Sequence, residues 1–114
     1  MEGLAIHAAL LACQDVPSLA SLVSFKTQHS AKGDLVAFRA RVDYSLFRPA
    51  RKHFEASAHP NAPFVASVLS SLNTAAVETA MAGGLDKREI KQVTLTAYAS
   101  TVSTAASGKT FKPY

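Results

Sequence analysis

Residues 35–47 read Leu-Val-Ala-Phe-Arg-Ala-Arg-Val-Asp-Tyr-Ser-Leu-Phe, and the interpretation of the fold depends on this stretch. Every second residue from Val36 to Leu46 is apolar or aromatic, and the polar residues from Arg39 to Ser45 all have the other parity. Successive side chains of a strand point to opposite faces, so this alternation is typical of a strand that is buried on one face. The stretch therefore predicts a strand that carries Arg39 and Arg41 on its solvent face. A strand of this length is expected to contain a bend or a bulge.

The same stretch also permits a helix. Phe38, Val42 and Leu46 would then share one helical face, and Asp34 would cap the first turn. We favour the strand because the polar residues keep one parity, and the helix remains the alternative.

Helices are predicted on both sides of this stretch. They cover residues 3–13, 15–28, 50–58 and 63–82. The helix over 63–82 has the most regular pattern, with Val65, Leu69 and Leu72 on one face, and Gly83-Gly84 ends it.

A further helix is predicted to begin at Asp86, because Asp86 and Glu89 form the D-x-x-E pattern of a capping box. The end of this helix is open. It either continues to about Val102, which gives a helical hairpin over 63–102, or it is short and leads into a strand over 93–102, where β-branched residues alternate.

These elements predict an α+β fold that is mainly helical, with about four helices and one or two strands, at 35–47 and in the second alternative at 93–102. Residues 1–102 are expected to form one globular domain and residues 103–114, which are small and polar, a flexible tail. A lone strand must find a pairing partner for its backbone, so we also expect a homodimer.

Positive charge is concentrated in the middle of the chain. The formal net charge is +4, and seven of the twelve Lys and Arg residues lie between Lys26 and His53. The densest part is Arg48-Pro49-Ala50-Arg51-Lys52. A surface of this kind suits the phosphate backbone of a nucleic acid, or an acidic protein surface.

Residues 76–93 have the layout of a helix-turn-helix, in which Gly83-Gly84 forms the turn and a second helix starts at Asp86. Lys87, Arg88 and Lys91 would lie near the exposed start of that second helix, where they could contact phosphates and bases. An ordinary capped helix whose charges face solvent explains the same residues and remains the alternative.

The sequence thus predicts a small basic nucleic-acid-binding protein, specifically a DNA-binding regulator or accessory factor. The alternative is a non-enzymatic adaptor or inhibitor that uses the same basic surface on an acidic protein partner. The predicted binding residues are Arg39, Arg41, Arg48, Arg51, Lys52, Lys87, Arg88 and Lys91. The nucleic-acid hypothesis gains most if the basic groups 39–52 and 87–91 lie on one face.

No motif predicts catalysis, a metal ion or a cofactor. The four histidines and Cys13 have no compact ligand spacing. The Gly108-Lys109-Thr110 sequence has neither the upstream glycine nor the following helix of a phosphate-binding loop. We therefore expect no enzyme, although His53, His59 and a carboxylate lining one pocket would favour one.

One cysteine cannot form an intramolecular disulfide, so the expected compartment is the cytoplasm. Leu10-Leu11-Ala12-Cys13 resembles a lipoprotein cleavage site, which makes export through a lipidated Cys13 the minor alternative. No apolar run approaches the roughly 20 residues of a membrane span, so no membrane partner is expected.

Overall fold

The computed structural model describes residues 3–98 and 100–114, which form three α-helices and one four-stranded antiparallel sheet. The helices are α1 (Gly3–Gln14), α2 (Phe47–Ala56) and α3 (Ala62–Ala82). The strands are β1 (Val23–His29), β2 (Leu35–Asp43), β3 (Gln92–Tyr98) and β4 (Thr101–Ser107), and they lie in the sheet in chain order. Three short 3-10 helices connect these elements, namely η1 (Ala20–Leu22), η2 (Tyr44–Leu46) and η3 (Lys87–Glu89).

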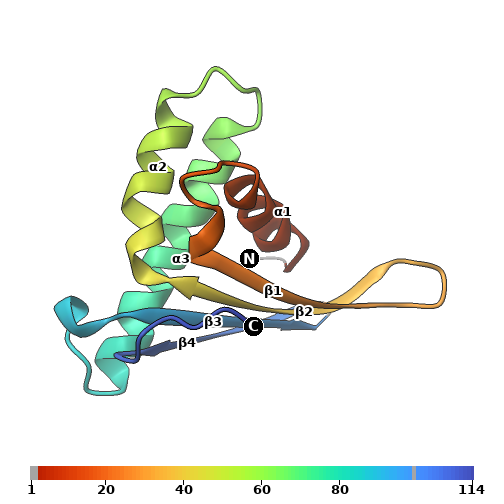
Figure 1. The fold of residues 1–114 in the computed structure, drawn as a ribbon. Helices are drawn as coiled ribbons and strands as arrows, with labels where there is room; N and C mark the ends of the chain where they lie inside the picture. Colours follow the sequence, from red (N-terminus) through yellow and green to blue (C-terminus); the bar gives the residue numbers. More distant parts are fainter. Residues whose placement is uncertain (1–2, 99) are drawn as a thin grey trace.

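The three helices form a layer on one side of the sheet, and within residues 3–98 and 100–114 no helix covers the other side (Figure 1). The two central strands direct their apolar side chains toward the helices. These buried side chains are Phe38, Ala40 and Val42 of β2 and Val93, Leu95 and Ala97 of β3. They pack with the buried face of α3, and removing this apolar surface from water is the main term that stabilises the fold.

β2 confirms the strand that the alternation predicted, although the strand ends at Asp43 rather than at Phe47. The Asp43 carboxylate accepts hydrogen bonds from the backbone N and the Oγ of Ser45, at 2.9 and 2.7 Å. These bonds cap η2, which leads directly into α2. The long bent strand expected over 35–47 is therefore replaced by a nine-residue strand that is followed by helix.

The helix predicted over residues 15–28 is wrong, because residues 15–19 form turns, Ala20–Leu22 form only η1, and Val23–His29 form β1. Leu19, Leu22 and Val23 have helical spacing, but pairing with β2 satisfies the backbone of this segment instead. A tight turn makes this pairing possible, and Gly33 occupies its left-handed position with a φ of 89°.

The mainly helical fold with one or two strands is also wrong, and so is the helical hairpin over 63–102. The capping box at Asp86 and Glu89 is present, but it opens only the three-residue η3. The chain then continues as β3, which pairs along its whole length with β2, and as β4. β3 and β4 contain several β-branched residues, which favour strands, in agreement with the strand alternative for 93–102. Ala99, within that segment, lies outside the described residues.

The pairing of the strands removes the reason for predicting a homodimer, since β2 has β1 on one side and β3 on the other. Residues 103–107, which the sequence placed in a tail, lie in β4. Residues 108–114 follow without regular secondary structure. Among the described residues, no helix has both the length and the apolar character needed to cross a bilayer.

Cys13 lies on the buried face of α1 and has no exposed surface. Because burial disfavours the charged thiolate, it raises the pKa of the Cys13 thiol from 9.0 to about 11. In the unfolded chain the thiol loses its proton at lower pH than in the folded protein, so stability should fall as pH rises from 9.0 toward about 11.

We expect Cys13 to contribute a loss of roughly 1–3 kcal/mol across that pH range. Urea unfolding between about pH 8 and pH 10.5 measures it, with Cys13→Ala as the control, because both proteins share all other titrating groups. Parallel declines in the two proteins would contradict this assignment. A thiol reagent at about pH 8 should also label the native protein far more slowly than the unfolded one.

Candidate nucleic-acid interface

The side of the sheet away from the helices, here called the open face, brings together basic and polar side chains from all four strands. On β2 it presents Arg39 and Arg41, whose neighbours along the strand point toward the core. Cross-strand pairing places Lys26 of β1 beside Arg39, and Thr96 of β3 on its other side. Arg41 lies between Ser24 and Thr94 in the same way.

The charge of the open face is mainly positive. Lys26, Arg39 and Arg41 are its cations, and Asp43 is its one carboxylate among the described strand residues. Asp43 lies at the end of β2, where its carboxylate already accepts two hydrogen bonds from Ser45. The centre of the face therefore offers three cations without a competing negative group.

A groove of about 320 Å³ crosses this face between β1, β2 and β3. Lys26, Gln28, Arg39, Thr96 and Tyr98 are among the residues that line it. Tyr98 is 60% exposed, although a large aromatic residue is usually better buried. Cations, hydroxyl groups and an exposed ring thus border one shallow depression.

The C-terminal segment 108–114 contacts the open face. Arg41 Nη1 donates a hydrogen bond to the carbonyl of Lys112 at 3.0 Å, and the backbone N of Tyr114 donates to Ser24 Oγ at 3.0 Å. The Tyr114 ring lies close to two of the three cations, with its centroid 5.2 Å from Lys26 Nζ and 5.0 Å from Arg41 Cζ. Both separations are typical of cation–π contacts.

Four of the other predicted binding residues lie elsewhere. Arg48, Arg51 and Lys52 of α2 and Lys87 of η3 line a depression of about 440 Å³, here called the basic hollow. It lies between α2, α3 and η3, on the helical side of the sheet. The basic groups 39–52 and 87–91 therefore do not share one face as a whole. Residues 48–52 and Lys87 come together, whereas Arg39 and Arg41 are on the open face.

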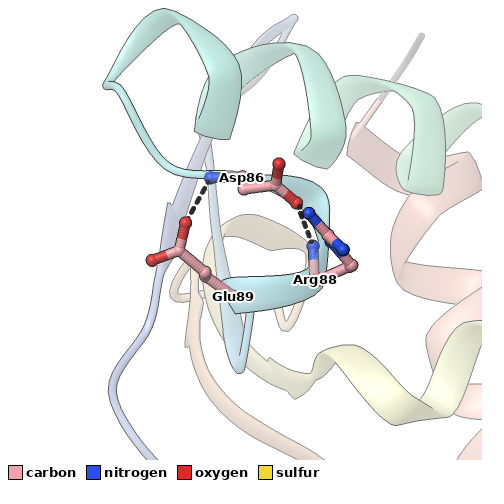
Figure 2. A network of polar contacts seen from close by, with 3 residues as sticks. All are labelled: Asp86, Arg88 and Glu89. Atoms are coloured by element: carbon pink, nitrogen blue, oxygen red, sulfur yellow. Dashed lines mark hydrogen bonds and ion pairs between the residues drawn. The ribbon is translucent and has the colours of Figure 1, made fainter.

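Residues 86–89 form one capped turn rather than a DNA-reading helix (Figure 2). The Asp86 carboxylate accepts from the backbone N of Arg88 at 2.9 Å, and Glu89 accepts from the backbone N of Asp86 at 3.0 Å. These bonds close one 3-10 turn, after which the backbone is extended. The helix-turn-helix predicted over 76–93 is therefore wrong, because its second helix is absent.

Arg88 and Lys91 consequently lose the role that the motif gave them. Arg88 Nε lies 3.3 Å from Asp86 Oδ1, in an exposed ion pair. Lys91 is exposed. Its backbone N donates a hydrogen bond to the carbonyl of Ser107, and its carbonyl accepts one from the backbone N of Tyr44, both at 2.9 Å. Neither residue lines the groove or the basic hollow.

Lys26, Tyr98 and Tyr114 belong to the open face but were not among the predicted binding residues. Lys26 was assigned to a helix, so its position beside Arg39 could not be inferred. A signal was present, because Ser24, Lys26 and Gln28 alternate with Val23 and Phe25, as in a half-buried strand. Tyr114 meets the sheet only through tertiary contacts.

A third depression, of about 320 Å³, contains the histidines that the sequence singled out. His53, His59 and Asp15 line it together with mainly apolar residues such as Phe54 and Phe64. This meets the condition that we set for favouring a small enzyme. However, no hydrogen bond or ion pair joins these three side chains in the described part of the chain, and no described group of His, Cys, Asp and Glu could hold a metal ion. His59 Nδ1 instead accepts a hydrogen bond from the backbone N of Asn61 at 3.1 Å.

Comparisons with protein-family models, with curated proteins and with solved structures each found no match to this chain.

Proposed function

We propose that this protein binds single-stranded nucleic acid on the open face of its sheet. The observation that supports this most is the juxtaposition of Lys26, Arg39 and Arg41 on two adjacent strands, on a face without helices and beside the exposed ring of Tyr98. The three cations would contact phosphates, while Tyr98 would stack on a base.

The contacts of Tyr114 support the same chemistry. Its ring lies about 5 Å from the charged groups of Lys26 and Arg41, as the ring of a nucleobase could. A planar aromatic group therefore fits these cations without rearrangement of the sheet, and a nucleobase would take this position by displacing the Tyr114 ring.

A single strand suits this face better than a duplex does. The major groove of DNA admits a helix or a two-stranded ribbon, whereas the open face is four strands wide. The bases of a single strand can instead turn toward a sheet and lie against its aromatic side chains.

Fluorescence anisotropy with labelled single strands and duplexes of equal length tests the proposal. With three phosphate contacts, the slope of log K against log salt should be about −2, so affinity should fall roughly 10- to 20-fold between about 50 and 200 mM salt. Single strands should bind more tightly than duplexes.

Absence of binding to any single strand at about 50 mM salt would contradict the proposal. It would favour the alternative that the basic surface meets an acidic protein partner. Equal binding to duplex and single strand would also argue against base stacking on Tyr98.

A further inference from the structure

The basic hollow contains more positive charge than folding requires. Arg48, Arg51 and Lys52 have helical spacing on one side of α2, so like charges are neighbours there. Such like-charged pairs destabilise a helix by a few tenths of a kcal/mol each. Lys87 reaches the same depression from η3, more than thirty residues along the chain.

Among the described residues that line the hollow, one carboxylate accompanies these four cations. Glu55 lines the hollow, and its Oε1 lies 3.7 Å from Arg51 Nη2 in a partly exposed ion pair. The lining side chains therefore retain an excess of three positive charges.

Arg51 also has an unsatisfied donor. Its Nε is buried and has no hydrogen-bond partner among the described residues. A buried donor without an acceptor is unfavourable, and arginine uses its planar fork to bind carboxylates and phosphates through two parallel hydrogen bonds. The Arg51 side chain is otherwise partly exposed, so its terminal nitrogens rather than Nε would meet an oxyanion in the hollow.

The walls of the hollow add an apolar side. Tyr44 and Phe47 form a tilted ring pair with centroids 5.6 Å apart, and Asn73 of α3 supplies an amide. The hollow thus combines a cationic region with aromatic rings and one neutral polar group.

We propose that the basic hollow binds the diphosphate group of a small phosphorylated ligand, separately from the open face. A diphosphate carries roughly three negative charges near neutral pH, which matches the excess charge of the lining. Arg51 and Arg48 would grip the phosphate oxygens in forked geometry, while Lys52 and Lys87 would act as point charges. The volume of about 440 Å³ lies within the range of small-ligand pockets.

Titration of the full chain with inorganic pyrophosphate, followed by amide NMR signals, tests this proposal. Signals from α2 and η3 should shift, and Lys52→Ala/Lys87→Ala should weaken binding at least about tenfold. Both lysines are exposed, so the double variant should fold. Arg39→Ala is the matched control, because it removes a cation from the open face and should leave pyrophosphate binding unchanged.

Adenosine diphosphate and a single-stranded oligonucleotide are two further probes, which distinguish a small phosphorylated ligand from a nucleic acid as the source of the phosphate. If the aromatic wall contributes to binding, adenosine diphosphate should shift the same amide signals and should bind at least as tightly as pyrophosphate. The proposal is overturned if pyrophosphate shifts no amide signals from residues around the hollow. It is also overturned if the double lysine variant binds pyrophosphate as tightly as the original chain does. Displacement of pyrophosphate by a single-stranded oligonucleotide would also overturn it, since the hollow would then belong to the nucleic-acid surface.

Discussion

Leu69→Ala should lower the free energy of unfolding by about 2–5 kcal/mol, the largest effect that we expect from any single substitution. Leu69 lies in the middle of α3, where it has no exposed surface. Its removal would lose buried apolar contact and leave a cavity in the layer between helices and sheet. The structure around a rigid helix and sheet can collapse only in part, so the loss should be near the middle of that range.

Urea unfolding followed by circular dichroism measures this loss. Ser67→Ala is the matched control, because Ser67 is exposed on the same helix and its replacement should change stability by less than about 0.5 kcal/mol. If Leu69→Ala were as stable as this control, Leu69 could not be packed in the core.

Reversing the charge of Arg39 and Arg41 together should weaken the binding of single strands by on the order of 100-fold or more. Hydrogen bonds between charged groups contribute about 1.5–3 kcal/mol each, and the new carboxylates would also repel phosphates. The double variant Arg39→Glu/Arg41→Glu should also lower the salt dependence, because fewer counterions are released. Anisotropy titrations at several salt concentrations measure both effects.

Lys52→Glu/Lys87→Glu is the control for this experiment. Both double variants lower the formal net charge from +4 to zero, but the control acts on the basic hollow rather than on the open face. It should therefore bind single strands within a few-fold of the original chain. Equal losses in the two variants would show that nucleic acid responds to overall charge or uses the helical side, and the open face would lose its proposed role.

Sequence reasoning predicted the elements whose signals are local. The two-residue period of 35–47 identified β2 and the solvent-facing position of Arg39 and Arg41, because alternation is a property of the strand itself. Helical spacing and Gly83-Gly84 located α3, and the D-x-x-E pattern located the cap at Asp86. The concentration of basic residues in the middle of the chain was also visible in the sequence.

The sequence could not place these basic residues relative to one another. Arg39 and Arg41 lie on the open face, while Arg51 lies in the basic hollow, although all three come from one short segment. The change from β2 to α2 at Asp43 separates them, and this change depends on a side-chain cap together with the packing of α2 on α3.

By itself, then, the sequence determined the positions of β2 and α3, the cap at Asp86 and the basic central segment, since each rests on residues a few positions apart. Tertiary structure decided that 23–29, 92–98 and 101–107 are strands, because β2 supplies the hydrogen-bonding partners of β1 and β3, and β3 supplies those of β4. It also brought Lys26 beside Arg39, Tyr114 onto the open face and Lys87 to α2. Contacts between residues far apart in the chain leave no periodic signal, so only the folded molecule reveals the two basic surfaces.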